Sequence, residues 1–416
     1  MAVVEIKALA STGKGTGHVE EKGFKVPFFV EFTMPGDVVE VCETKREKKY
    51  VEAEIVKFIT KSTRSDAACK HYMICGGCNL LHIPYDTQIQ SKKEILQHIL
   101  ARNKLEFPEI EIVPSDNIYN YRYRAKAFFE NQDGKLICGF NQRKTNTAVP
   151  IEECHIVHKK ILGAIKALNN AKLDSGMRAA GVFTVNESDD SVILQLFSKQ
   201  RRPTIEAALK DHVKQVLYEE ENQKDAFVYS YYVGERQYKL SYSTGFIQSN
   251  LALNKKLVNH IFDYFADDYT GNASMLADLY CGNGNISLPL AQIFKKMTLV
   301  EGDRTSYLHL KDNLQKNRIN NATAYNMDVV RFVRNPQHFD AIILDPPRTG
   351  CGDDVIQGIM AMTPDSIVYV SCDATVSAKE LKILNSTYNI EKVTMFDMFP
   401  HTNHIESVYF LKKKSD

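Results

Sequence analysis

The stretch "SMLADLYCGNGNISLPL" (274–290) decides how the C-terminal part of the chain is interpreted. Residues 274–280 form an apolar, strand-like run, and Gly282 and Gly284 follow it closely. Glycine permits a tight turn and a close approach of the backbone to a ligand, and we predict that a helix begins at about Asn285. A strand that passes through a glycine turn into a helix is the repeating unit of doubly wound α/β sheets.

The alternation of strands and helices continues to the C-terminus. Helical stretches lie among the strands at 285–294, 305–319, 353–362 and 375–386. This alternation predicts a parallel sheet of the Rossmann-like kind, covered on both faces. No helix separates the last two strands, so we expect a terminal hairpin and one antiparallel strand. The predicted strands are 274–280, 297–303, 322–328, 339–345, 366–372, 392–399 and 406–412.

Length and composition set the broad class of protein. A chain of 416 residues is expected to form about two or three domains. Its 44% hydrophobic and 25% charged residues are typical of a globular protein, and the net charge of +1 neither favours nor excludes an acidic partner. Because no apolar run reaches membrane-spanning length and the first residues do not resemble a signal peptide, we expect a cytoplasmic protein, and a monomer.

Three segments differ in character. Residues 1–58 contain short β-runs separated by Gly and Pro turns at 11–18 and 34–37, which predicts a small OB-like barrel. The barrel could be a structural appendage or, with the basic stretch 45–50, an RNA-binding module. Residues 59–240 are of mixed α/β character, with a helical stripe at 85–105, and residues 241–416 carry the alternating sheet.

The stretch "YNYRYRAKAFFE" (119–130) is predicted to be a strand of the central segment. Alternation then places Arg122, Arg124 and Lys126 on one face of the strand. Three neighbouring cations can bind phosphates, although an ordinary solvated face has the same pattern.

Acidic residues end several of the predicted parallel strands. Glu301 ends the second strand, Asp328 the third, and "LDPPR" (344–348), with Asp345, the fourth. Ligands of doubly wound sheets bind beyond the carboxyl ends of the strands. The turn after the first strand lacks the full G-x-G-x-x-G of NAD-binding folds, so the set favours S-adenosylmethionine. Each acid alone could equally be a helix cap or a solvated residue.

Cys372 ends the fifth strand, and by topology it faces the same crevice as Asp345. A lone cysteine is more often a buried inert thiol, which is our interpretation of Cys281 and Cys351. A thiolate beside a methyl donor suits a poor carbon nucleophile such as C5 of uracil, because addition of sulfur to C6 makes C5 enolate-like.

A base must then remove the proton from C5 so that the thiol can be eliminated. The stretch "FPHTNHIESVYFL" (399–411) offers one. Glu406 enters the last strand and is the first candidate, with His401 and His404 as rivals.

Cys69, Cys75 and Cys78 form a C-x5-C-x2-C pattern. Three thiolates so close together can face one metal centre, and Cys154 is the best candidate for a fourth ligand, followed by Cys138. Both zinc and a [4Fe–4S] cluster fit four cysteines.

Several motifs together resemble one family, the RNA uracil-C5 methyltransferases, in particular the RumA-like enzymes of 23S ribosomal RNA. Residues 13–41 are similar to the TRAM barrel of that family and residues 69–96 to its iron–sulfur segment. The motifs of the C-terminal segment are "YSTGFIQSN" (242–250), "DLYCGNGN" (278–285), "LDPPRTG" (344–350), "YVSCDATV" (369–376) and "HTNHIESV" (401–408).

The resemblance implies a set of roles. Cys372 would be the nucleophile and Glu406 the base, and Cys154 would complete a [4Fe–4S] cluster with Cys69, Cys75 and Cys78. S-adenosylmethionine would bind at Gln248, Tyr280, Gly282, Asn285, Glu301, Asp328 and Asp345.

The expected partner is RNA, gripped by Arg122, Arg124 and Lys126, with the target base extruded or offered by a loop. Large-subunit ribosomal RNA is the expected substrate, and transfer RNA uridine 54 is the alternative. Two other classes stay open: an amino-group methyltransferase of adenine or guanine, and a non-catalytic RNA-binding factor of ribosome assembly.

Overall fold

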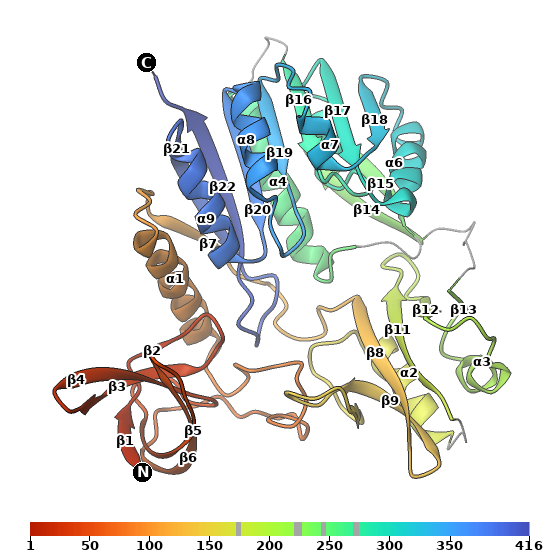
Figure 1. Ribbon diagram of the computed structural model, residues 1–416. Helices are drawn as coiled ribbons and strands as arrows, with labels where there is room; N and C mark the ends of the chain where they lie inside the picture. Colours follow the sequence, from red (N-terminus) through yellow and green to blue (C-terminus); the bar gives the residue numbers. More distant parts are fainter. Residues whose placement is uncertain (172–175, 220–226, 243–246, 269–273, 416) are drawn as a thin grey trace.

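The computed structural model describes residues 1–171, 176–219, 227–242, 247–268 and 274–415. Figure 1 shows three lobes, with the N-terminal sheet and the central sheet side by side below the large C-terminal sheet. Within the described ranges, no helix combines the length and the apolar character needed to cross a membrane.

The N-terminal lobe is a six-stranded sheet in the order β1-β5-β6-β4-β3-β2. Only two residues separate β1 from β2, so one segment supplies both edges of the sheet, an arrangement compatible with the predicted barrel. Its core includes Val4, Ile6, Val39 and Val41. The strands are β1 (Ala2–Glu5), β2 (Ala8–Leu9), β3 (Gly15–Glu21), β4 (Phe24–Val30), β5 (Val38–Arg46) and β6 (Val51–Thr60).

One detail of this lobe differs from the sequence prediction, because β3 occupies part of the expected glycine turn at 11–18. Gly17 lies against β1, and a Cβ atom there would be 2.2 Å from the Glu5 carbonyl oxygen. The glycine therefore serves a close approach of two strands and not a turn.

The central lobe is a six-stranded sheet in the order β10-β9-β8-β11-β12-β13. Helix α2 (Lys159–Asn170) packs on it, and α3 (Pro203–Leu209) packs on α2. The strands are β8 (Arg124–Gln132), β9 (Lys135–Asn141), β10 (Ala148–Pro150), β11 (Arg178–Val185), β12 (Val192–Leu196) and β13 (Gln215–Leu217). The strand predicted from residue 119 begins only at Arg124, and Arg122 instead forms isolated bridges with Val157 and Asn250.

The C-terminal lobe is an eight-stranded sheet in the order β18-β17-β16-β19-β20-β22-β21-β7. Strands β18, β17, β16, β19 and β20 are parallel, and β22 is antiparallel to both of its neighbours, which confirms the predicted terminal hairpin. The strands are β7 (Ile110–Val113), β16 (Met275–Leu279), β17 (Lys296–Glu301), β18 (Ala322–Asn326), β19 (Ala341–Leu344), β20 (Ser366–Ser371), β21 (Tyr388–Phe396) and β22 (Glu406–Lys413).

Two features of this lobe were not predicted. Strand β7 comes from the central segment of the sequence and pairs with β21 at the edge of the sheet. The hairpin of β14 (Phe227–Val233) and β15 (Arg236–Tyr242) shares a hydrophobic core with the large sheet. The boundary between the central and the C-terminal segment that was predicted at residue 240 stays a prediction.

Helices cover both faces of the large sheet (Figure 1). The predicted helix at 353–362 is found with the same ends, whereas the one at 285–294 is reduced to the single turn Ser287–Leu290. The helices are α1 (Tyr85–Arg102), α4 (Leu251–Asp268), α5 (Ser287–Leu290), α6 (Arg304–Lys316), α7 (Val329–Val333), α8 (Asp353–Met362) and α9 (Ala374–Leu384).

Candidate active site

The parallel strands of the large sheet end at one edge, and the segments that follow them enclose a cavity of about 790 Å³. The structure thus brings together the residues that the sequence proposed for the cofactor, the nucleophile and the first candidate for the base. These are Gln248, Tyr280, Gly282, Asn285, Glu301, Asp328, Asp345, Cys372 and Glu406.

The turn after β16 has an unusual backbone conformation. Tyr280 has φ +70°, in the left-handed region that an aromatic residue rarely adopts, and Gly282 and Gly284 have φ +56° and +93°. The Asn285 side chain exchanges hydrogen bonds of 2.9 Å with Asn254 of α4. A non-glycine residue held in a left-handed conformation is typical of functional sites.

Two carboxylates hold the neighbouring loops in place. Glu301 accepts hydrogen bonds from the backbone N–H groups of Gly282 at 2.8 Å and Asp303 at 2.6 Å, and burial raises its pKa. Asp328 caps α7 by accepting from the N–H of Val330 at 2.8 Å. Asp328 is therefore a helix cap and a cavity residue at once.

Asp278 lines the same cavity, although the sequence analysis did not propose it for the site. Its carboxyl accepts a hydrogen bond from the Ser287 hydroxyl, and its second oxygen is buried without a partner. Burial raises the pKa of Asp278 to about 8. In the sequence, the only sign of a place for Asp278 in the site is an acidic residue within an otherwise apolar strand.

Cys372 and Glu406 approach each other through the antiparallel pairing of β20 and β22. The last paired residues are Ser371 and Ser407, so Cys372 and Glu406 lie at the next opposed position. Opposed residues of an antiparallel pair project to the same face of the sheet. Both side chains line the cavity, with Cys372 half-buried and Glu406 only 4% exposed.

Burial shapes the protonation of this pair. It raises the pKa of Cys372 to about 11, an effect increased by the Glu406 and Asp345 carboxylates and opposed by the Arg348 guanidinium. Burial likewise raises the pKa of Glu406 to about 8, again increased by Asp345 and opposed by Arg348. Burial raises the pKa of Asp345 to about 7. The carboxyl groups of Glu406 and Asp345 therefore ionise near neutral pH.

The two histidines proposed as rivals of Glu406 do not line the cavity that contains Cys372. The His401 ring hydrogen-bonds the Gln88 amide at 3.1 Å and stacks on Tyr119. His404 lines an adjoining cavity. Burial lowers the pKa of both imidazoles to about 4, which leaves them neutral near pH 7.

The adjoining cavity, of about 490 Å³, is bordered by Cys69, Cys75, Cys78 and Cys154. Cys138, the other candidate for the fourth position, is fully buried in the central core and does not border it. In the described residues, no three His, Cys, Asp or Glu side chains gather closely enough to hold a single metal ion. The predicted metal site is therefore not confirmed.

Four cysteine side chains around one cavity supply the donor set that both zinc and a [4Fe–4S] cluster take.

Three residues line both cavities: Arg124, Arg348 and Phe399. Arg122 and Lys126 border the cysteine cavity, so all three cations proposed for RNA face the same space. The Arg122 guanidinium lies 5.8 Å from the ring centroids of both Tyr121 and Phe399. Arg348 and Phe399 were not proposed for the site, although Arg348 follows the Asp-Pro-Pro motif directly.

Comparisons with known proteins extend these observations. Residues 84–414 match the family described as tRNA (uracil-5-)-methyltransferase, and residues 2–63 match the TRAM domain of tRNA (uracil(54)-C(5))-methyltransferase. The chain is 27% identical to a 23S rRNA (uracil(1939)-C(5))-methyltransferase of Aliivibrio salmonicida, with 99% of this chain and 96% of the relative covered. It is 30% identical to an uncharacterised RNA methyltransferase of Thermotoga maritima, with 99% and 98% covered.

A solved structure has the same fold over the whole chain. It is the tRNA (uracil-54, C5)-methyltransferase of Pyrococcus abyssi in complex with S-adenosyl-L-homocysteine. The TM-score is 0.73 at 23% identity, with 99% of this chain and 100% of that chain covered.

Proposed function

Because the chain belongs to the tRNA (uracil-5-)-methyltransferase family, it is an S-adenosylmethionine-dependent RNA (uracil-C5)-methyltransferase, and we propose that its substrate is a uridine of 23S ribosomal RNA. The observation that carries the chemistry is the placement of the Cys372 thiol opposite the Glu406 carboxyl in one buried cavity. The choice of ribosomal RNA rests on relatives aligned over their full length that act on uracil 1939 of 23S rRNA.

Cys372 and Glu406 divide the chemistry between them. The thiol loses its proton to water, and its sulfur bonds to C6 of the uracil, which moves electron density to C5. S-adenosylmethionine, when bound, supplies the methyl group that C5 then takes. Glu406 removes the proton from C5, and the electron pair of that C–H bond restores the C5–C6 double bond as the sulfur leaves.

The raised pKa of Glu406 suits this role. A carboxylate whose pKa is about 8 is a stronger base than an exposed one, since basicity follows pKa. The same burial leaves much of Glu406 protonated at neutral pH. We therefore expect the rate to rise with pH as Glu406 ionises.

The cofactor would lie against the turn after β16 and the ends of β17 and β19. The Glu301 carboxylate already accepts from two backbone N–H groups and keeps lone pairs for ribose hydroxyls. Tyr280 offers an aromatic face for the adenine. The remaining proposed contacts are Gln248, Gly282, Asn285, Asp328 and Asp345.

We assign a [4Fe–4S] cluster to Cys69, Cys75, Cys78 and Cys154. This assignment is supported by the cavity that the four cysteines share and by the position of Cys138 outside it. The cluster would have a structural or RNA-positioning role, because methyl transfer to C5 needs no electron transfer. A cytoplasmic location suits it, since none of the nine cysteines forms a disulfide.

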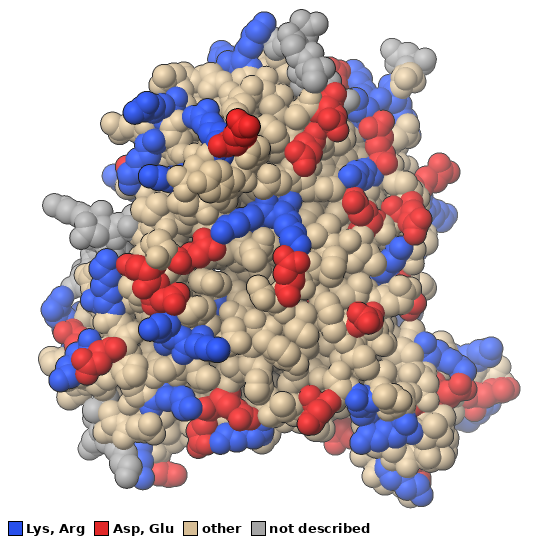
Figure 2. Space-filling model, turned by 180° about the vertical axis from the view of Figure 1, so that it is seen from behind, with Lys and Arg blue, Asp and Glu red and all other residues tan. Residues whose placement is uncertain are grey.

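RNA would reach Cys372 past Arg122, Arg124 and Lys126, with the target base extruded from its stack. On the face shown in Figure 2, Lys and Arg are interspersed with Asp and Glu and form no broad basic surface. Contacts of these three cations with phosphates would therefore contribute much of the affinity for RNA that this face of the molecule does not supply.

One experiment tests the proposal directly. Ribosomal and transfer RNA from cells with and without the gene are mapped by mass spectrometry for 5-methyluridine. Loss of the modification from 23S RNA supports the proposal, and loss from position 54 of transfer RNA supports the alternative. Unchanged RNA together with retained RNA binding would support a non-catalytic assembly factor.

A further inference from the structure

The segment 397–405 joins β21 to β22 and leads directly into Glu406. Phe396 and Glu406 are the last paired residues of these two strands, so the segment is a loop closed at the proposed base. Phe399, in the same loop, lines both cavities. The conformation of the loop therefore sets how Phe399 and Glu406 are presented to a substrate.

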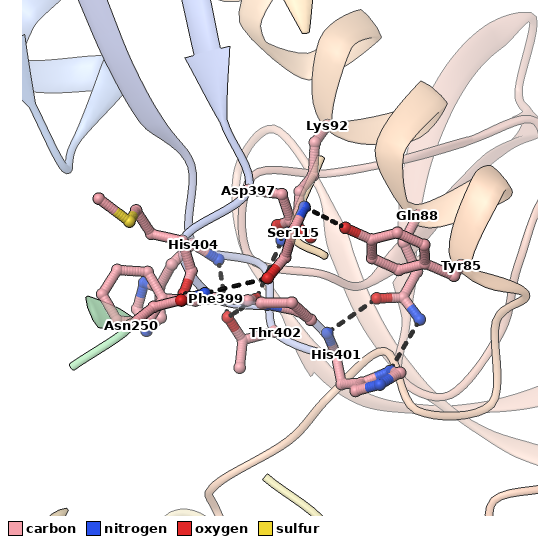
Figure 3. Close-up of polar contacts among 12 residues, drawn as sticks. Tyr85, Gln88, Lys92, Ser115, Asn250, Asp397, Phe399, His401, Thr402 and His404 are labelled. Carbon is pink, nitrogen blue, oxygen red and sulfur yellow. Dashed lines mark hydrogen bonds and ion pairs between the residues drawn. The ribbon is translucent and has the colours of Figure 1, made fainter. Parts of the chain in front are cut away.

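Lys92 of α1 holds the start of this loop (Figure 3). Its ammonium group lies 2.5 Å from the Asp397 carboxylate and donates a hydrogen bond of 3.1 Å to the Phe399 carbonyl. The side chains of Lys92 and Asp397 are 1% and 0% exposed. One buried cation thus fixes two positions of the loop.

Gln88, one turn earlier on α1, holds the middle of the loop (Figure 3). Its amide oxygen accepts from the His401 N–H at 2.9 Å, and its amide nitrogen contacts the His401 ring at 3.1 Å. His401 has φ +65°, and its carbonyl accepts from the backbone N–H groups of Asn79 and Leu80. A left-handed residue persists only where its surroundings determine it.

We propose that Lys92, with Asp397 as its counter-ion, is a positioning residue that aligns the 397–405 loop so that Glu406 can take the C5 proton. The inference rests on the proposed function of Glu406. A buried ion pair adds little net stability relative to an apolar pair of similar size, because desolvation offsets the attraction. The hydrogen bond from Lys92 to the Phe399 carbonyl also fixes the position of the loop, which an apolar pair would not do.

The test compares Lys92→Met with the double variant Lys92→Met/Asp397→Leu. The single variant leaves a buried carboxylate without a partner and can unfold, whereas the double variant removes both charges. Lys93→Met is the matched control, since Lys93 is the next residue of α1 and pairs with the exposed Glu109. Each variant is assayed for melting temperature, cofactor binding and methylation of RNA carrying hydrogen or deuterium at C5 of the target uridine.

We expect the double variant to bind the cofactor as wild type does and to lose about 100-fold in kcat, the loss typical of a misplacement of about 1 Å. The rate of methylation should show a larger primary deuterium isotope effect than in wild type, because removal of the C5 proton becomes slow. A merely structural pair would change stability without changing the isotope effect.

The outcomes separate the inference from the proposed function. A folded double variant with the kcat and isotope effect of wild type overturns the role of Lys92, while methylation by the wild type still upholds the proposed reaction. Methylation by Glu406→Gln at the wild-type rate, with no isotope effect, overturns the proposed base and the inference with it.

Discussion

Cys372 and Glu406 lie directly beyond Ser371 and Ser407, the last residues paired between β20 and β22. The Ser407 hydroxyl also donates to the Ser371 carbonyl at 3.3 Å. Because β22 inserts antiparallel between β20 and β21, it presents its first residue where β20 presents its last. The antiparallel strand is thus what joins the proposed nucleophile to the proposed base.

Substitution Cys372→Ala should abolish methylation and leave RNA affinity within a few-fold of wild type, because the thiol forms the bond to C6 but contributes little to binding. Methyl incorporation and filter binding measure the two effects. Cys42→Ala is the control, since Cys42 is exposed in the N-terminal sheet. Methylation that survives in Cys372→Ala would favour an amino-group methyltransferase.

Substitution Glu406→Gln should trap the enzyme on its RNA, because sulfur addition and methyl transfer precede proton removal. The covalent complex would be seen as a shifted band in a denaturing gel with unmodified substrate RNA. His404→Gln is the matched comparison, because that ring lies in the same loop but outside the cavity of Cys372. If His404→Gln accumulates the complex and Glu406→Gln does not, the base is the histidine.

Glu406 should also make stability depend on pH. Its pKa is about 8 in the folded protein against 4.5 for the free group, so the folded state holds the proton more tightly. The stabilisation of the folded state by this bound proton is complete below about pH 4.5 and is lost as pH rises through about 8. Glu406→Gln mimics the protonated acid, and it should raise the free energy of unfolding by roughly 1–3 kcal/mol more at pH 8 than at pH 5.

Urea denaturation at the two pH values measures this difference. Glu391→Gln, an exposed carboxylate of β21, is the control. An equal effect of Glu406→Gln at both pH values would show that Glu406 is not held protonated by its surroundings.

The sequence predicted the acidic residues of the cofactor edge because each follows a predicted strand of the parallel sheet. The stretches 341–344 and 367–370 are apolar and buried, so they mark strands covered on both faces, and parallel order then brings Asp345 and Cys372 to one edge. Asp328 and Glu301 followed from the same reasoning.

Residues whose contacts join distant segments could not be predicted in this way. Strand β7 is four residues long, and only its pairing with β21 reveals it. Lys92 resembles any other lysine of an amphipathic helix, and its burial depends on Asp397, which is distant in sequence. Arg122 belongs to the strand predicted at 119–130 but lies outside the observed strand β8, because bridges to Val157 and Asn250 replace the ladder there.

Protein purified without oxygen should be brown and contain about four irons per chain if the four cysteines hold a [4Fe–4S] cluster. Cys154→Ser should lower the iron content and the visible absorbance, because Cys154 borders the cavity with the other three cysteines. Cys138→Ala should keep both, since Cys138 is enclosed in the core. Stoichiometric zinc in a colourless protein would contradict the cluster.

Lys126 should contribute one phosphate contact to RNA binding. It is exposed on β8 beside the cysteine cavity, and its ammonium group lies 5.4 Å from the centroid of the Phe128 ring. Lys126→Ala should weaken binding about equally for all RNA sequences and reduce the slope of log affinity against log salt by about one. Lys135→Ala is the control, because Lys135 is exposed on the neighbouring strand β9 and borders neither cavity. Equal salt slopes for Lys126→Ala and wild type would place the RNA backbone away from this strand.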